Sequence, residues 1–377
     1  MKILMLTTNS SLMDGINRHI LTIAPTINSF QDCEVAVCTV YPRAELNEAL
    51  EREGVRSFSL NAVSGHDWRI FGAFYKVMRE FNPDIIHSHV MALNEKIMLS
   101  TIFRSKKYIQ TIHGISDKIE RETLRMKLDR WLDKTFKIRY DSICVVSNGV
   151  RQTIFRGNEK ESVYTVYNPI LFGEDVPKEY KLHKIINVPE DVPVIGTCCR
   201  LAAVKNPPLF TKVMCRVLQM NERTHAVVLG DGDASIKQTL KTIVEKANVS
   251  ERFHFLGYRQ DAPDLIRDLS CFVMTSISEG LPTSLLEAMS NKIPFAMMKG
   301  NGGLIDIAEL NEKEGPIGIV VDKDDIEAQI NGICELINTP SYAKSLIENA
   351  FEVGIKYFDT KNVCYKLYCI YKDIYHT

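Results

Sequence analysis

The feature that most constrains the fold is a series of short apolar runs. They alternate with helical patterns from one end of the chain to the other. Seven runs occupy the first half, at residues 2–8, 34–41, 55–60, 84–90, 107–114, 141–147 and 162–168. Six more follow, at residues 192–200, 225–230, 252–257, 270–276, 293–298 and 317–321. Segments long enough for a crossover helix separate most of them, such as 66–81, 206–220 and 235–248. Val- and Ile-rich strands alternating with helices predict parallel sheets covered on both faces.

A proline-rich stretch separates the two series of strands. Residues 168–193 carry four prolines, which is typical of a linker. At 377 residues the chain exceeds what one ordinary core holds. We therefore expect an α/β protein with two doubly wound, Rossmann-like domains facing across a cleft, at residues 1–170 and 171–355. Ligands of such sheets bind beyond the carboxyl ends of the strands, so functional residues are expected there.

Composition narrows the class of protein. The formal net charge of −1 gives no reason to expect nucleic acid as a partner. No stretch approaches the roughly 20 apolar residues that span a bilayer, and the apolar N-terminal run is too short for a signal peptide. The ten cysteines are scattered without a C-x-x-C pair, which indicates reduced thiols rather than disulfides or a zinc site. These features predict a cytoplasmic protein.

A glycine and three histidines follow strands of the first half. Gly15 opens a helix, where it either shapes the turn or lets a ligand approach the backbone. His87 and His89 end one strand, and His113 ends another just before a glycine. Each histidine can bind a substrate oxygen or transfer a proton, or it can be structural; His113 is the better candidate. They have no cysteine or acidic partner at metal-ligand spacing, so we predict no metal site.

Two cations follow the first strand of the second half. Arg200 and Lys205 lie in one loop ahead of a helix that starts near residue 206. Such a pair can flank a diphosphate, the guanidinium binding two oxygens and the ammonium acting as a point charge. Ordinary surface charge is the alternative. Gly230 opens a Gly-Asp-Gly-Asp string after another strand, but the third glycine of a dinucleotide fingerprint is missing.

Two glutamates lie in the stretch S-E-G-L-P-T-S-L-L-E, which leads from strand 271–276 into a helix beginning at Thr283 or Ser284. With Ser284 as the N-cap, Glu287 occupies the third helical position and completes a capping box. Glu279 lies before the helix, so the helix does not explain it. The N–H groups at this helix N-terminus suit a phosphate.

The order of these motifs resembles that of the retaining, nucleotide-sugar-dependent glycosyltransferases of family 4 (group 1), which have the GT-B fold. E-G-L-P-T-S-L-L-E-A-M resembles the family's E-x7-E motif, and R-L-A-A-V-K-N-P resembles its diphosphate segment. Other segments resemble further landmarks of the family, which occur in the right order along the chain. They are V-V-L-G-D-G-D, F-H-F-L-G-Y-R, D-I-I-H-S-H, T-I-H-G and V-V-S-N-G-V-R. The resemblance covers nearly the whole chain.

The resemblance implies a role for each candidate. Glu287 would hold the ribose hydroxyls, while Glu279 and His113 would contact the transferred sugar. Arg200 and Lys205 would neutralise the diphosphate leaving group. Glu279, His113, Arg200 and Lys205 are thus the candidate catalytic residues. The base would lie against loop 257–259, and the phosphates would meet the Gly15 loop and the first turn after Gly280. The other donor-binding candidates are Gly230, Gly257, Tyr258, Arg259, Gly280, Leu281, Pro282, Thr283 and Ser284.

The resemblance also implies that neither a cofactor nor a divalent metal is needed, because fixed cations serve the diphosphate. A final helix, residues 356–377, would cross back onto the first domain and bury its aromatic side chains. Two departures from the family pattern concern the phosphate loops. Asp14 precedes Gly15 where the family has paired glycines, and Cys199 precedes Arg200 where glycine is common.

Residues 118–139 combine many basic side chains with an apolar stripe that includes Trp131 and Phe136. A basic amphipathic helix can dock on an anionic membrane surface that carries a lipid-linked acceptor. The alternative is a domain helix with its stripe in the core. Both interpretations remain open at this point, so peripheral contact with the inner face of the cell membrane is an expectation.

The sequence thus supports one leading hypothesis. A hexose or N-acetylhexosamine is transferred, with retention, from a nucleotide diphosphate sugar, expected to be UDP-linked, to a glycan or lipid-linked acceptor. Synthesis of bacterial exopolysaccharide, capsule or lipopolysaccharide is the expected setting. The alternatives are a GT-B relative with other chemistry, such as an epimerase or phosphorylase, and a non-catalytic protein that binds nucleotide sugars or glycans. A dehydrogenase is the least favoured, for want of the glycine fingerprint.

Overall fold

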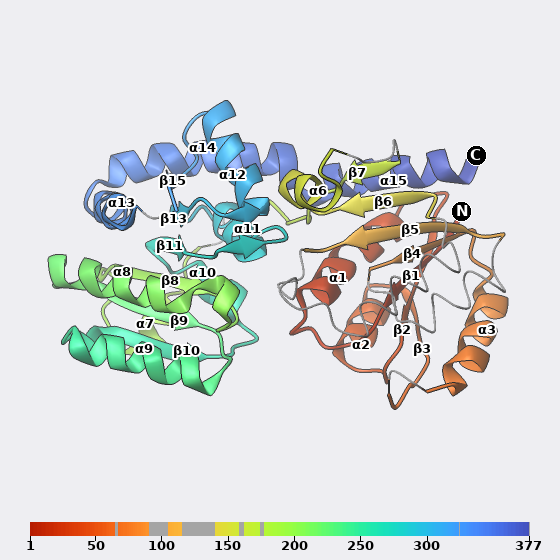
Figure 1. Cartoon of the computed structure of the whole chain (residues 1–377), viewed down its shortest axis with the longest axis horizontal. Coiled ribbons are helices and arrows are strands. Elements are labelled where there is room, and N and C mark those ends of the chain that lie inside the picture. Colours follow the sequence, from red (N-terminus) through yellow and green to blue (C-terminus); the bar gives the residue numbers. More distant parts are fainter. Residues whose placement is uncertain are drawn as a thin grey trace. The chain divides into compact units, whose positions relative to one another are not determined.

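A computed structural model describes residues 1–64, 67–89, 105–114, 140–157, 162–173, 177–323 and 325–376. It divides into two compact units: Met1–Pro169 together with Thr360–Thr377, and Ile170–Asp359. Each unit is a parallel sheet with helices packed on it (Figure 1). The amphipathic helix predicted at residues 118–139 lies outside the described residues. Within the described part, every helix is too short or too polar to cross a membrane.

The first unit is built on a seven-stranded sheet of order β3-β2-β1-β4-β5-β6-β7, in which all described pairs are parallel. Its strands are β1 (Lys2–Thr7), β2 (Glu34–Thr39), β3 (Arg56–Ser59), β4 (Ile85–Ser88), β5 (Lys107–Ile112), β6 (Ser142–Val145) and β7 (Val163–Thr165). Its helices are α1 (Gly15–Asn28), α2 (Glu45–Arg52), α3 (Arg69–Phe81), α6 (Asn148–Phe155) and α15 (Thr360–His376). Each strand coincides with a predicted apolar run.

Both faces of this sheet are buried, as the continuous apolar runs require. Because successive strand residues point to opposite faces, Ile3 and Met5 of β1 pack with α1, α2 and α15. Leu4 and Leu6 pack on the other face, with α3. Burial on two faces explains why the strands are apolar throughout instead of alternating with polar residues.

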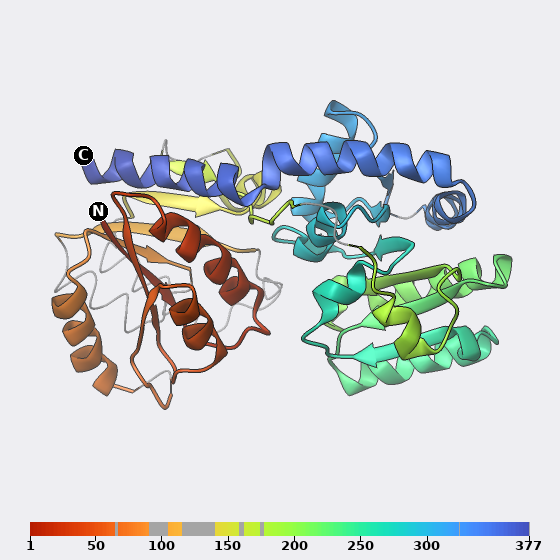
Figure 2. The same ribbon diagram turned by 180° about the vertical axis from the view of Figure 1, so that it is seen from behind.

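The C-terminal helix α15 belongs to the first unit, as predicted, and lies along α1 (Figure 2). Its buried face consists of Val363, Cys364, Leu367, Ile370, Tyr371 and Ile374. At its edge, the Tyr368 hydroxyl donates to Asp32 at 3.0 Å, and Lys372 pairs with the same carboxylate at 2.7 Å. The expectation that this helix buries its aromatics was wrong for Tyr365 and Tyr375, which are 61% and 44% exposed. Their helical positions place them away from the apolar stripe.

The second unit contains a six-stranded parallel sheet of order β10-β9-β8-β11-β13-β15 and a separate two-stranded ladder, β12-β14. The main strands are β8 (Val194–Cys198), β9 (His225–Leu229), β10 (Phe253–Gly257), β11 (Cys271–Met274), β13 (Phe295–Met298) and β15 (Ile319–Val321). The ladder joins β12 (Ser278–Glu279) to β14 (Asn301–Gly302). Every main strand was predicted from an apolar run, whereas the ladder was not, because two-residue strands show no periodicity.

Helices cover this second sheet. They are α7 (Lys181–Ile186), α8 (Pro207–Met220), α9 (Ala234–Lys246), α10 (Ala262–Ile266), α11 (Thr283–Ser290), α12 (Gly303–Lys313), α13 (Ile326–Asn338) and α14 (Pro340–Phe358). Buried side chains of α8, α9, α13 and α14 share one core with β8, β9, β11 and β13. The sheet is therefore the rigid element from which the loops that carry Lys205 and Glu279 project.

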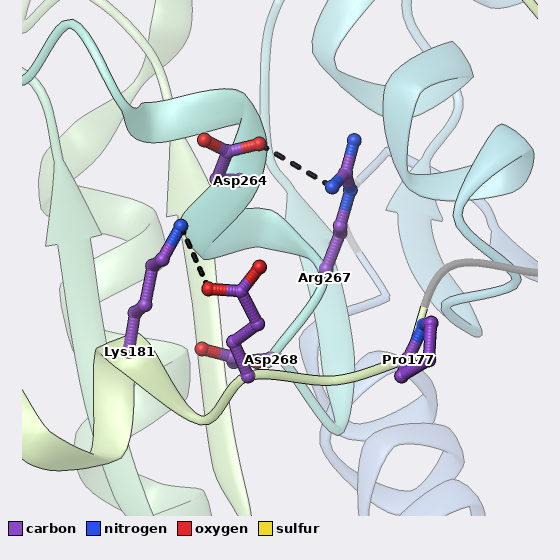
Figure 3. A pocket seen from close by; sticks show the side chains of 6 residues that line it. Pro177, Lys181, Asp264, Arg267 and Asp268 are labelled. Carbon is purple, nitrogen blue, oxygen red and sulfur yellow. Dashed lines mark ion pairs between the residues drawn. The ribbon is translucent and has the colours of Figure 1, made fainter.

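The short helix α7 in the proline-rich segment is fixed to this unit by a buried carboxylate. Asp268, 3% exposed, accepts hydrogen bonds from the backbone N–H groups of Tyr180 and Leu182, at 3.1 and 2.9 Å. Figure 3 shows Asp268 and Lys181 of α7 among the side chains that line one pocket. Because the first N–H groups of a helix have no intrahelical partner, Asp268 supplies what a local cap would otherwise supply.

Replacing Asp268 with alanine should lower the free energy of unfolding by about 2–4 kcal/mol, since two buried donors lose their acceptor. Chemical denaturation of the wild-type protein and of this variant would measure the change in the free energy of unfolding. Asp264→Ala is the matched control, because its 3.4 Å pair with Arg267 is partly exposed and such pairs contribute about 0–1 kcal/mol. Equal losses in both variants would contradict the capping role.

Candidate functional site

Two of the predicted site residues, 74 positions apart, meet in the second unit. The Lys205 ammonium donates a hydrogen bond to Oε2 of Glu279, and the two form an ion pair. The Glu279 side chain is only 8% exposed and that of Lys205 22%. A carboxylate buried to this degree requires a cation beside it, because an isolated charge is expensive to remove from water. The structure therefore couples the diphosphate segment and the E-x7-E motif directly.

The backbone around Lys205 is fastened to the end of β11. Lys205 closes a 3₁₀ turn, Ala203–Lys205, just before α8. The Ile277 N–H donates to the Val204 carbonyl at 2.8 Å. The Thr275 hydroxyl lies 3.3 and 3.4 Å from the carbonyls of Asn206 and Lys205. These bonds join the loop after β8 to the loop after β11, so the two charged side chains come from one connected piece of backbone.

The β12-β14 ladder holds the backbone of Glu279. Its register pairs Glu279 with Gly302, which has a φ of +64°. A Cβ added at Gly302 would lie 2.0 Å from the Glu279 carbonyl oxygen, far closer than atoms can approach. Gly302 is thus required both by its left-handed φ and by the close passage of the two strands.

Gly302→Ala should therefore force the ladder apart and lower the free energy of unfolding by about 1–3 kcal/mol. Thermal or urea denaturation would measure this change. Gly72→Ala in α3 is the control: a Cβ there would meet no described heavy atom within 4 Å, and Gly→Ala in a helix is neutral or stabilising by up to about 1 kcal/mol. A Gly302→Ala protein as stable as wild type would show that the ladder does not hold Glu279.

The helix after Glu279 begins at Thr283, as predicted, but the predicted capping box is wrong. The N-cap is Pro282, whose carbonyl accepts from the N–H groups of Leu285 and Leu286 at 3.0 and 3.1 Å. Pro282 makes no side-chain capping bond, and Glu287 is the fifth residue of the helix rather than its third. The N-cap residue therefore offers no side-chain acceptor to the first N–H groups of α11, and Glu287 does not occupy the capping-box position.

Arg200 follows Cys199 in the loop after β8 and is exposed. Among the described residues its guanidinium has no hydrogen bond or ion pair with another side chain, so it is open to an anion. Cys199 lies near the Lys205–Glu279 pair, and burial raises the pKa of its thiol to about 11, with Glu279 adding to the shift and Lys205 opposing it. The thiol is neutral at pH 7, so Arg200 and Lys205 are the charged side chains of this loop.

The glycines of the Gly-Asp-Gly-Asp string have a packing explanation. Gly230 has a φ of +143°, and a Cβ on it would lie 1.9 Å from the Cys199 carbonyl oxygen. Gly232 bridges to Leu201, where a Cβ would lie 2.3 Å from that residue's oxygen. These glycines let the loop after β9 pass close to the Arg200 loop. Gly230 thus shapes the candidate site through the backbone beside it.

Loop 257–259, the predicted contact for the base, presents one aromatic and one paired cation. Tyr258 is 40% exposed. Arg259 donates two hydrogen bonds to Asp261, both at 2.8 Å, so its guanidinium is held within its own loop. Gly257 has a φ of +67°, and its carbonyl accepts from the Gly230 N–H at 2.8 Å. This bond links the loop to the Gly230 turn.

Gly15 and His113 belong to the first unit. Gly15 is the first residue of α1, which is capped by Asp14, and a Cβ on Gly15 would meet no described heavy atom within 4 Å. The described fold therefore has no steric need for glycine there. His113 shares a hydrogen bond with His89, between nitrogens 3.0 Å apart. His19 of α1, which sequence reasoning missed, joins them, its ring centroid 4.9 Å from that of His113.

Both halves of the chain match known protein families. Residues 13–170 match the family model described as Glycosyltransferase Family 4, and residues 179–353 match the model of group 1 glycosyl transferases. An uncharacterized glycosyltransferase of Methanocaldococcus jannaschii is 26% identical over 58% of this chain and 56% of its own length. An Escherichia coli galactosyltransferase that acts on a diphosphoundecaprenol-linked GlcNAc is 23% identical over 71% of this chain and 70% of its own.

Among solved structures, Anabaena HepE in complex with UDP and glucose superposes with a TM-score of 0.79. The alignment has 17% identity and covers 99% of this chain and 100% of that one. This likeness confirms the predicted fold class, and the two family models together account for most of the chain. The protein therefore belongs to the group 1, family 4 glycosyltransferases and has their GT-B fold.

Proposed function

We propose that the protein transfers a hexose or N-acetylhexosamine from a nucleotide diphosphate sugar, with UDP as the nucleotide, to a glycan or lipid-linked acceptor. The buried Lys205–Glu279 pair carries this proposal. It lies in the loops beyond the ends of β8 and β11, where ligands of parallel sheets bind, just before the N-terminus of α11, whose N-cap is a proline. A purely structural ion pair would not need that position.

The proposed chemistry assigns a part to four charged residues of the second unit and to the N-terminus of α11. As the bond between the anomeric carbon and the diphosphate oxygen breaks, negative charge grows on the diphosphate, and Arg200, Lys205 and the N–H groups of α11 stabilise it. The acceptor hydroxyl forms its new bond on the same face of the sugar, and its proton passes to the departing phosphate oxygen. Glu279 orients the sugar and Glu287 the ribose. Fixed cations take the place of a metal at the diphosphate.

Two similar proteins support the choice of substrates. The E. coli relative uses UDP-galactose and an undecaprenol-linked acceptor, and HepE was solved with UDP and glucose. By analogy, we assign this protein a place in bacterial surface polysaccharide synthesis, in the cytoplasm and in peripheral contact with the cell membrane where lipid-linked acceptors lie. The contact is assigned to residues 118–139, and loss of liposome binding on truncating Trp131 and Phe136 would test it.

A panel of nucleotide sugars tests the proposal. A ligand that binds the folded protein raises its melting temperature by mass action. We expect UDP and at least one UDP-sugar to do so at millimolar concentration, and GDP-, ADP- and TDP-sugars to do so less. With the best donor, the anomeric proton coupling in the NMR spectrum of the product reports retention. No shift with any nucleotide would refute the transferase proposal, and an inverted product would refute retention.

The alternatives predict different results in the same assays. A non-catalytic binding protein would be stabilised by a nucleotide sugar without releasing UDP in the presence of acceptor. An epimerase would convert the sugar of the free donor without an acceptor. The helix N-terminus of α11 and the exposed Arg200 favour transfer, since both suit the charge of a departing diphosphate.

A further inference from the structure

Three histidines from separate parts of the sequence gather in the first unit. His19 lies on α1, while His89 and His113 follow β4 and β5, which are neighbours in the sheet. His19 is 8% exposed and His89 is 3% exposed. One ring nitrogen from each of the three lies within 4.8 Å of the other two. Three imidazoles this close together, two of them buried, form a cluster within the fold rather than a chance group on the surface.

Two nitrogens of this cluster lack a partner. Nδ1 of His19 and Nε2 of His89 are buried and make no hydrogen bond with any described residue. Buried polar atoms are nearly always satisfied, because leaving one unpaired costs its desolvation free energy. Among the hydrogen bonds of the described residues, one joins two members of the cluster: it links Nδ1 of His89 to Nε2 of His113. The unsatisfied nitrogens therefore point to a ligand that binds imidazole.

A fourth histidine supports the cluster from behind. The ring of His87 lies 4.3 Å from that of His89, centroid to centroid. Both of its nitrogens are occupied, Nδ1 by the Tyr371 hydroxyl at 2.5 Å and Nε2 by the Thr111 hydroxyl at 2.7 Å. His87 is therefore held in place and packs on His89 instead of contributing a nitrogen. Helix α15 thus holds the ring of His87 in position through the hydroxyl of Tyr371.

We propose that His19, His89 and His113 form a site for a first-row divalent transition-metal ion such as Zn²⁺. Ligands of neutral imidazole select zinc, copper, nickel or iron over magnesium and calcium, which prefer oxygen. Metal–nitrogen bonds of about 2.0–2.1 Å in a tetrahedron place ligand nitrogens about 3.3 Å apart, so the rings need to close by about 1.5 Å at most. Three protein ligands leave a fourth position open.

The electrostatics suit this ion. Burial lowers the pKa of His113 to about 3 and depresses those of His19 and His89, with neighbouring imidazoles adding to the effect. Burial thus favours the neutral form of these imidazoles, which is the form that binds metals. This ion would differ from a cation bound to the diphosphate, a role that the proposed function gives to Arg200 and Lys205. The sequence predicted no metal because His87, His89 and His113 have no cysteine or acidic partner at metal-ligand spacing, and His19, in a helix, was not among the candidates.

Cobalt provides the test, because tetrahedral Co²⁺ has visible absorption bands and binds the same ligands as Zn²⁺. The full chain, purified without a histidine tag and freed of metal by a chelator, should bind one Co²⁺ per molecule with those bands. Zn²⁺ should abolish the bands and raise the melting temperature. His19→Ala should weaken binding by more than about 100-fold, since even changes outside the ligand shell cost 10- to 100-fold.

The second unit offers a matched control in His225 and His254, whose rings are stacked with nitrogens 2.9 Å apart. His225→Ala should leave cobalt binding unchanged. Absence of stoichiometric uptake by the wild-type chain would overturn the proposal, as would a loss in His225→Ala equal to that in His19→Ala. If His19→Ala does not fold, X-ray absorption of the wild-type complex decides: three imidazole ligands support the site, and fewer contradict it.

Discussion

Replacing Lys205 with methionine is expected to lower kcat/KM for the nucleotide sugar by about 100- to 1,000-fold, as removal of one group that stabilises developing negative charge does in other enzymes. Methionine keeps an unbranched side chain only one atom shorter and removes the charge. The Glu279 carboxylate is then buried without its cation. Initial rates of UDP release at varied donor concentration would measure the effect.

This substitution also changes stability, and the two effects can be separated. Lys205→Met should lower the free energy of unfolding by roughly 1–3 kcal/mol, less than the 3–5 kcal/mol of a fully buried pair because Lys205 is 22% exposed. The double variant Lys205→Met/Glu279→Gln removes both charges and should recover most of that loss without recovering activity. Recovery of both would mean that the pair is structural alone.

A neighbouring lysine serves as the control. Lys237 pairs with Asp231 at 2.7 Å, but both side chains are about half exposed. Such pairs contribute about 0–1 kcal/mol. Lys237→Met should therefore keep wild-type stability and kcat/KM. A loss of activity comparable to that of Lys205→Met would mean that general positive charge, rather than the buried pair, drives donor turnover.

Substitutions of the two glutamates of the E-x7-E motif are expected to have different kinetic effects. Glu279→Gln keeps the shape of the side chain and should lower kcat by about 100-fold with little change in KM, because its contact strengthens as the sugar reacts. Glu287→Ala should raise the Kd for UDP by about 10- to 100-fold, since hydrogen bonds to a charged group are each worth about 1.5–3 kcal/mol. Kinetics and calorimetry measure the two effects.

Glu245→Ala, an exposed change on α9, is the control for both and should alter neither value. The assignment of roles would be wrong if Glu279→Gln weakened UDP binding while Glu287→Ala lowered only kcat. Full activity in both variants would remove these glutamates from the site altogether.

Much of the fold was predictable because the strands are buried on both faces. Lys2–Thr7 and Cys271–Met274, for example, are apolar enough to stand out without any partner being known. The pairing of Lys205 with Glu279 was not predictable in the same way. Each residue could be identified as a candidate from its position after a strand, but their contact depends on the bonds that join the loops after β8 and β11.

Other features depend on tertiary contacts that leave no local pattern. S-L-L-E is a good capping box by spacing, yet the N-cap is Pro282, two residues before Ser284, and Glu287 becomes the fifth helical residue instead of the third. Gly230 and Gly302 read as ordinary loop glycines until the backbone oxygens that face them are known. His19 sits within the amphipathic pattern of α1, and only the sheet brings it to His89 and His113.

The crystal structure of the complex with UDP tests the central claim most directly. We predict that the diphosphate contacts Arg200, Lys205 and the N–H groups at the start of α11, and that the ribose hydroxyls bond to Glu287. The sugar position next to the diphosphate should then lie beside Glu279. A nucleotide bound elsewhere, or at this site without contact to Lys205 and Glu287, would contradict the account.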